Sequence, residues 1–237
     1  MALDGCEASG WMLEDGDVVV LAQKIVSKAE GRTVRLADVQ PSARAVEIAA
    51  EVHKDPRLVE LILREAKQVM RTKPGVLIVE DRRGLILANA GVDHSNVAQD
   101  PEADGEENTV LLLPEDPDAS AERLRAEIEE RTGARVGVII TDSLGRPWRL
   151  GTVGFAIGVA GFPALLDLRG RPDLFGQKLR TTDVGEADQV AAAASLLMGQ
   201  VDEGRPVVMV RGLTYTDGTA DGPATALLRP EHEDMFR

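Results

Sequence analysis

Short apolar runs alternate with longer segments of helical periodicity along this chain. Runs rich in β-branched residues and without polar alternation predict strands that are buried on both faces. Such runs occupy Asp17–Ala22, Val76–Glu80, Leu85–Ala90, Val110–Leu113, Val136–Ile140 and Pro206–Val210. Helical spacing or alanine enrichment predicts helices at Pro41–Val52, Asp55–Met70, Ser120–Thr132 and Gly185–Met198. Because the sequence shows neither an internal repeat nor a clear linker, we predict a single compact unit over residues 1–237.

The second of these helices carries the clearest start signal. Asp55 followed by Pro56 offers an N-cap and a first-turn proline. Apolar positions from Leu58 to Val69 then share one helical face. The spacing therefore predicts a helix that continues to Met70.

The most informative stretch is Val136–Arg149, in which an apolar run leads to Asp142 and Ser143, and then to Arg146 and Arg149. In open α/β sheets, ligands collect just beyond the carboxyl ends of such strands. A carboxylate and a hydroxyl are hard oxygen ligands for a metal ion, and arginines bind phosphate. The stretch therefore predicts metal-dependent phosphate chemistry.

Each of these residues also has a simpler interpretation. Asp142 could cap a turn that begins at Leu144, as Asx residues often do. Arg146 and Arg149 could be solvated loop charges, and Trp148 between them could serve packing rather than stacking on a planar ring.

A second oxygen-rich cluster follows another predicted strand. Its members are Asn89, Asp93, Ser95 and Asn96. A turn is the simplest interpretation of this composition. If both strand ends face one cleft, however, Asp93 and Asp142 could share a divalent ion, since Mg²⁺ uses one or two protein carboxylates together with water and phosphate oxygens.

Lys24, Ser27 and Lys28 lie just past the first predicted strand, where a lysine could neutralise a transferring phosphoryl group. For Lys24 we favour an ordinary surface lysine. The chain has no GxxxxGK[ST] motif, and Gly151, Gly154, Gly158 and Gly161 do not form GxGxxG. These glycines instead predict close backbone packing, for which a subunit interface is one possible setting.

Composition narrows the class of partner and metal. A net charge of -13 and an aromatic content of 3% argue against nucleic acid as a partner. With three histidines and one cysteine, a zinc site is disfavoured, and Mg²⁺ or Mn²⁺ held by carboxylates fits better. No apolar segment is long enough to cross a membrane and no signal peptide is visible, so we predict a cytoplasmic enzyme.

Taken together, several stretches resemble the coenzyme F420-0:L-glutamate ligase family. They are VVVLAQKIVSKAEGR, ILANAGVDHSNV, LLLPEDPDAS, GVIITDSLGRPWRLG, FAIGVAG and AAASLLMGQ, in order from about Asp17 to Gly212. The resemblance implies a GTP-dependent ligase that attaches glutamate to the lactyl carboxylate of coenzyme F420-0, and then to the γ-carboxylate of the glutamate already added. It also implies an α+β fold without a P-loop or Rossmann motif, a homodimer, divalent cations, and K⁺ as an optional monovalent ion.

The resemblance also implies roles for individual residues. Metal binding is implied for Asp93 and Asp142, and for Ser143 at a second ion. Nucleotide contacts are implied for Gln23, Lys28 and Asn96, with Gln200 near the nucleotide or the metal.

From these roles we hypothesise a mechanism. Asp93 and Asp142 hold a divalent ion on the GTP phosphates, and Lys28 spreads charge while the acceptor carboxylate becomes an acyl phosphate, which the glutamate amine attacks. Arg146 and Arg149 are candidates for holding the anionic tail of the acceptor. The alternatives are a metal-dependent phosphohydrolase and a non-catalytic module that binds a deazaflavin or a nucleotide.

Members of that family usually begin with a further strand and a Gly-Pro loop that contacts the nucleotide. Met1–Gly10 contains no equivalent. The resemblance therefore implies either that this sequence starts later than the sequences of the family, or that the protein binds GTP differently or poorly.

Overall fold

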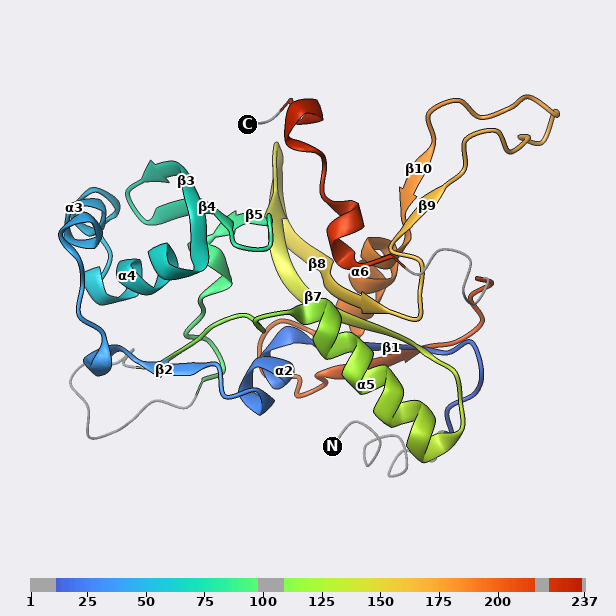
Figure 1. Cartoon of the computed structure of the whole chain (residues 1–237), viewed down its shortest axis with the longest axis horizontal. Helices are drawn as coiled ribbons and strands as arrows, with labels where there is room; N and C mark the ends of the chain where they lie inside the picture. The colour runs from blue at the N-terminus through green and yellow to red at the C-terminus, as the bar shows by residue number, and fades with distance from the viewer. Residues whose placement is uncertain (1–11, 98–108, 216–221, 236–237) are drawn as a thin grey trace. The chain divides into compact units, whose positions relative to one another are not determined.

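The computed structural model describes residues 12–97, 109–215 and 222–235. The chain divides into two compact units. Unit 1 comprises Met1–Ala22 and Asp116–Arg229, and unit 2 comprises Gln23–Glu115 and Pro230–Arg237. Both units combine helices with small mixed or antiparallel sheets (Figure 1), which confirms the predicted α+β class.

Unit 1 is built on a four-stranded sheet in the order β11-β1-β7-β8. Its strands are β1 (Val18–Ala22), β7 (Gly137–Arg146), β8 (Arg149–Ala160) and β11 (Val207–Val210). β1 runs parallel to β7 and antiparallel to β11, and β7 forms an antiparallel hairpin with β8. Val18, Val20 and Ile139 are fully buried, as the apolar runs of the sequence predict.

Two helices of unit 1 pack against this sheet. α5 (Pro117–Thr132) starts at Asp116, whose side chain accepts from the Ala119 N–H at 2.9 Å, and ends at Gly133 in the left-handed conformation. α6 (Glu186–Met198) buries its alanine-rich face in the core. Both predicted helices are thus confirmed, although α5 begins three residues before the predicted Ser120.

The glycines of β8 allow both helices to approach the strand closely. A Cβ at Gly154 would lie 2.5 Å from the Ala191 oxygen in α6, and one at Gly158 would lie 2.3 Å from the Pro117 oxygen in α5. The predicted close backbone packing is therefore confirmed at these two positions, and it occurs between elements of this chain.

Replacing Gly158 by alanine should consequently destabilise unit 1, because the new methyl group meets backbone that cannot rotate away. We expect a loss of about 1–3 kcal/mol in the free energy of unfolding, measured by urea titration. Gly145→Ala is the matched control, since nothing in the described part of the chain lies within 4 Å of a Cβ there. Equal stability of the two variants would contradict the packing argument.

β8 lies at the edge of the sheet, and two carboxylates each accept a hydrogen bond from one of its N–H groups. The Ala156 N–H donates to Asp188 at 2.9 Å, and the Val159 N–H donates to Asp118 at 2.8 Å. Burial raises the pKa of both carboxyl groups, and the N–H donors oppose that rise. Asp118 also accepts from the Ala224 N–H at 2.8 Å, at the start of η3 (Ala224–Leu227), so it fixes the C-terminal part of unit 1 to the strand.

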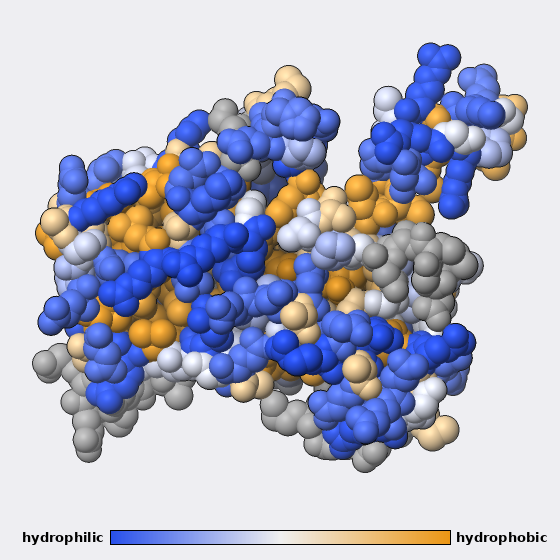
Figure 2. Space-filling model, in the orientation of Figure 1, coloured by the Kyte–Doolittle hydropathy of each residue, from blue (hydrophilic) through white to orange (hydrophobic). Residues whose placement is uncertain are grey.

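An arm projects from unit 1 between β9 (Leu165–Asp167) and β10 (Asp183–Gly185), as Figure 1 shows. Figure 2 shows that hydrophilic side chains cover most of it. Leu174 and Phe175 are nonetheless almost fully exposed near its end.

The described part of unit 2 contains three α-helices and a three-stranded sheet of order β3-β4-β5. The two longer helices are α3 (Ala43–Val52) and α4 (Pro56–Glu65), and the strands of the sheet are β3 (Ala66–Lys73), β4 (Val76–Asp81) and β5 (Ile86–Ala88). A separate strand pair joins β2 (Thr33–Arg35) to β6 (Thr109–Leu111), and α2 (Gln23–Ala29) leads into it. The described part of the unit also contains three short 3-10 turns: η1 (Leu36–Asp38), η2 (Asn89–Gly91) and η4 (Glu231–Glu233).

The predicted helix Asp55–Met70 is wrong in its second part. Asp55 caps α4 as expected, accepting from the Arg57 N–H at 2.7 Å, but the helix ends at Glu65. Residues 66–73 instead form β3, which pairs antiparallel with β4. Pairing with a buried neighbouring strand outweighs the helical spacing of the apolar positions, which is a weak preference by comparison.

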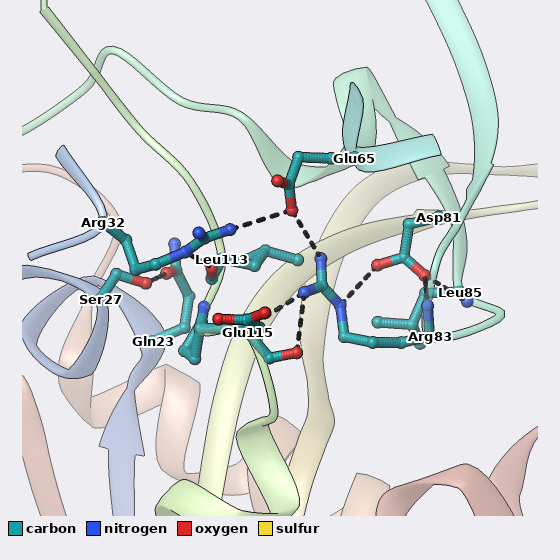
Figure 3. A network of polar contacts seen from close by, with 10 residues as sticks. Gln23, Ser27, Arg32, Glu65, Asp81, Arg83, Leu85, Leu113 and Glu115 are labelled. Carbon is teal, nitrogen blue, oxygen red and sulfur yellow. Dashed lines mark hydrogen bonds and ion pairs between the residues drawn. The ribbon is translucent and has the colours of Figure 1, made fainter. Parts of the chain in front are cut away.

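A network of charged side chains holds unit 2 together (Figure 3). Arg83 donates to Asp81 at 2.8 Å and to the Pro114 carbonyl at 2.8 Å. Arg32 donates to Glu65 at 3.0 Å and to the Leu113 carbonyl at 2.9 Å. The two arginines thereby fix the segment that follows β6 to the end of α4 and the turn after β4.

Among the described helices, none combines the length and the apolar character needed to cross a membrane.

Candidate functional site

Candidate residues of unit 2 gather where α2 meets the loop after η2. We call Lys24, Lys28, Asp93, Ser95 and Asn96 the lysine–loop cluster. The Lys24 ammonium lies 2.7 Å from Asp93 Oδ2 and also donates to the Ser95 carbonyl and hydroxyl. Lys28 donates to the Asn96 carbonyl at 2.6 Å. Because the lysines are four residues apart, they lie on one face of the helix and meet the same loop.

Local chemistry shapes this loop. Asp93 accepts from the Ser95 N–H at 2.8 Å and from its hydroxyl at 3.0 Å, which is an Asx turn. Asn96 has a φ of 55°, a conformation that asparagine tolerates better than most residues. The loop is also fixed to β6 through a bridge between Asp93 and Leu111. The predicted turn and the predicted oxygen-rich cluster are therefore the same feature.

Asp93 is held in its charged form. Burial alone would raise the pKa of this carboxyl group, but the hydrogen bonds from Lys24 and from the Ser95 N–H outweigh burial and lower the pKa. The contribution of Asp93 to stability is therefore present above the ordinary pKa of an aspartate and is lost as the pH falls through its lowered value.

Lys24→Met should raise the pKa of Asp93. The substitution removes the hydrogen bond and the positive charge that lower this pKa, whereas the burial that raises it remains. The measurement is the pH titration of the Asp93 carboxyl carbon by NMR. Lys28→Met is the control, since Lys28 contacts the Asn96 carbonyl and should leave the Asp93 titration unchanged. An unaltered Asp93 pKa in Lys24→Met would show that the ion pair does not control this group.

Gln23, which the resemblance places at the nucleotide, is 1% exposed at the start of α2. Its amide oxygen accepts from the Ser27 hydroxyl at 2.8 Å (Figure 3). The contact joins two buried residues one turn apart within α2, the helix that also carries the two lysines.

In unit 1, the strand that carries Asp142 is longer than predicted. β7 continues to Arg146, so Asp142 and Ser143 lie within a strand and not beyond its end. Asp142 is opposite Phe155 in β8, a strand that the sequence analysis did not predict. Leu144 is also a strand residue, so the alternative that Asp142 caps a turn beginning there is wrong.

Strand geometry separates Asp142 from Ser143. Successive side chains point to opposite faces of a strand, and the Ser143 hydroxyl donates to the Gln200 amide oxygen at 2.8 Å, just past the end of α6. Asp142 Oδ1 accepts from the Ser143 N–H at 2.8 Å. The resemblance implies functional roles for Asp142, Ser143 and Gln200, and the structure brings Ser143 and Gln200 into direct contact.

The donor types at both places fit a hard divalent cation. Carboxylate, hydroxyl and amide oxygens are the ligands that Mg²⁺ and Mn²⁺ prefer. In the part of the chain that the structure describes, no three His, Cys, Asp or Glu side chains gather to hold a metal ion. An ion bound by Asp93 or Asp142 would therefore take much of its shell from neutral oxygens, water and substrate. Asp93 belongs to unit 2 and Asp142 to unit 1, and their sharing of one ion stays a prediction.

Comparison with known proteins decides the family. The model of the F420-0:Gamma-glutamyl ligase family matches residues 1–212, which span both units. The chain belongs to this family. Its similarity to individual members is correspondingly extensive, and the resemblance found in the sequence is confirmed.

Three relatives named coenzyme F420:L-glutamate ligase illustrate the similarity. That of Methanocaldococcus jannaschii is 45% identical over 225 residues, which cover 95% of this chain and 86% of the relative. That of Methanothermobacter thermautotrophicus is 44% identical over 237 residues, covering 100% and 91%. That of Methanopyrus kandleri is 48% identical over 227 residues, covering 95% and 87%.

Lys24 is the residue that sequence reasoning undervalued. The sequence favours an ordinary surface lysine at this position, yet Lys24 forms the ion pair with Asp93. The signal was its spacing of four residues from Lys28 on a helix that the apolar pattern did not predict. The stretch Met1–Gly10, with its expectation about GTP binding, lies outside the described residues.

Proposed function

We propose that this chain is a GTP-dependent ligase that joins L-glutamate to the carboxylate of coenzyme F420-0 and then extends the product through γ-linkages. The observation that carries the proposal is membership of the F420-0:gamma-glutamyl ligase family over both units. The lysine–loop cluster supports it, because two lysine ammonium groups and a carboxylate meet at one loop, and such cations suit a phosphate ligand.

Amide formation needs an activated carboxylate. In the proposed route, an acceptor carboxylate oxygen attacks the γ-phosphorus of GTP, and the bond from that phosphorus to the GDP oxygen breaks. The glutamate amine then attacks the acyl carbon, loses a proton, and releases inorganic phosphate that carries the attacking oxygen. Catalysis of such transfers is chiefly positioning and electrostatic stabilisation, so the chain needs no covalent nucleophile.

Lys28 is the cation best placed to act on phosphate. Among the described residues its recorded partner is the neutral Asn96 carbonyl and not a carboxylate, so its charge can act on an anionic ligand. Lys24 instead neutralises Asp93 and fixes the loop. We therefore assign phosphate stabilisation to Lys28 and positioning to Lys24.

Asp93, Asp142 and Ser143 are the proposed metal ligands, with Gln200 beside Ser143. A bound Mg²⁺ or Mn²⁺ would neutralise charge on the phosphate oxygens. K⁺ as a further ion and a homodimer belong to the same proposal.

The test is incubation of the purified chain with coenzyme F420-0, GTP, Mn²⁺ and glutamate, followed by mass spectrometry and phosphate assay. The proposal expects a product heavier by whole glutamyl units and one phosphate released per amide formed. Phosphate release from a phosphoester without glutamate addition would instead support the phosphohydrolase alternative. Ligand binding without turnover would support the non-catalytic module, and either result would overturn the proposal.

A further inference from the structure

The tip of the β7–β8 hairpin presents an aromatic ring between two guanidinium groups. We call Arg146, Pro147, Trp148 and Arg149 the hairpin tip. Arg146 and Arg149 are paired directly across the strands, and Pro147 and Trp148 form the turn between them. Trp148 is 82% exposed. Like charges opposite each other destabilise a strand pair, so the requirements of the hairpin do not explain this arrangement.

The backbone conformation of Trp148 is likewise not explained by the requirements of the hairpin. Its φ is 59°, in a two-residue turn whose first position is proline. These are features of a type II turn, in which glycine or asparagine normally occupies the second position. A bulky residue is strained there, and such outliers tend to mark functional positions. The turn would form more easily with glycine, and what tryptophan adds is an outward-facing ring.

The charges define the ligand that this surface suits. Two adjacent guanidinium groups favour an acidic group lying between them, and their planar forks match phosphate or carboxylate oxygens. Arg146 is oriented by a hydrogen bond to the Gly151 carbonyl at 3.2 Å. An exposed indole stacks on flat aromatic rings with little dependence on their exact substituents. The hairpin tip therefore fits a ligand that combines a planar ring with a nearby anion.

We propose that the hairpin tip binds the deazaflavin end of the acceptor. The deazaflavin ring would stack on Trp148, and anionic groups of the acceptor next to the ring would bind Arg146 and Arg149. This inference rests on the proposed function, because it takes the deazaflavin as the substrate. Asp142 and Arg146 both lie in β7, four residues apart, or about 13 Å at the rise of a strand. The acceptor would then extend along β7, with its reacting carboxylate toward Asp142.

Binding can be measured without catalysis. Trp11 and Trp148 are the two tryptophans of the chain, so Trp11→Phe leaves Trp148 as the sole indole. Titrating this variant with coenzyme F420-0, in the absence of nucleotide and metal, should quench its fluorescence as the ring stacks. Equilibrium dialysis of Trp148→Gly in the otherwise unchanged chain should show acceptor affinity lowered by about tenfold. Its melting temperature should be equal or higher, because glycine suits a positive φ.

Arg146→Gln and Arg149→Gln should each raise the Kd and the KM for the acceptor by about tenfold, with a smaller change in kcat. Arg171→Gln, which removes the same charge from the exposed arm of unit 1, should leave both constants unchanged. Unquenched Trp148 fluorescence, or wild-type acceptor affinity in all three hairpin variants, would overturn the inference even if glutamate is added normally. Tight, tip-dependent acceptor binding without any amide product would instead overturn the proposed function and leave this site standing.

Discussion

Asp142→Asn is expected to lower ligase turnover by about three orders of magnitude while the fold remains intact. Asparagine keeps an oxygen that can accept the Ser143 N–H, so the strand geometry of β7 survives. It removes the negative charge proposed to hold a divalent cation, and a neutral amide is a far weaker ligand for Mg²⁺ or Mn²⁺.

Steady-state assays at saturating metal and GTP measure this effect, with circular dichroism as the check on folding. Asp167→Asn is the control, because it changes another strand aspartate of unit 1 that is exposed and paired with Arg169. Activity of Asp142→Asn within a few-fold of the wild type would remove Asp142 from the proposed metal site.

Asp81→Ala should cause the largest loss of stability, about 3–5 kcal/mol in the free energy of unfolding of unit 2. Asp81 is fully buried at the end of β4. It accepts from the Arg83 and Leu85 N–H groups at 2.9 Å each, and pairs with the Arg83 guanidinium at 2.8 Å. Alanine leaves the two N–H groups without this acceptor and removes the carboxylate that pairs with a largely buried arginine, which costs more than the pair itself contributes.

Urea denaturation followed by circular dichroism measures the loss, and hydrogen exchange can localise it to unit 2. Asp38→Ala is the matched control, since Asp38 is an exposed aspartate of the same unit and should change stability by less than about 0.5 kcal/mol. If Asp81→Ala unfolds at the same urea concentration as Asp38→Ala, the network in Figure 3 does not stabilise the unit.

The sequence predicts the central strands of unit 1 well. Burial on both faces of a strand produces a short continuous apolar run, which is typical of such strands. Val18–Ala22 and Val207–Val210 are found almost where the pattern places them. β8 was missed because its glycines, which the helices need for close approach, resemble a loop or interface signal. β3 was mistaken for helix because local spacing cannot reveal a pairing partner that follows in the chain.

In the candidate site, too, features that depend on neighbouring residues could be predicted from the sequence, whereas contacts between distant residues could not. The turn at Asp93 follows from its own residues, but its ion pair with Lys24 joins positions 24 and 93 and depends on tertiary structure. Ser143 and Gln200 likewise meet through the packing of α6 on the β7–β8 hairpin. Residue types could therefore be predicted from motif resemblance, whereas the face of the strand on which each side chain lies could not.

Oxygen transfer during the reaction tests the central claim most directly. The acceptor is prepared with ¹⁸O in its reacting carboxylate and incubated with the chain, GTP, Mn²⁺ and glutamate, and the released phosphate is analysed by mass spectrometry. Phosphoryl transfer to the acceptor predicts one ¹⁸O atom in the phosphate for every amide bond formed. Amide formation accompanied by unlabelled phosphate would contradict the account.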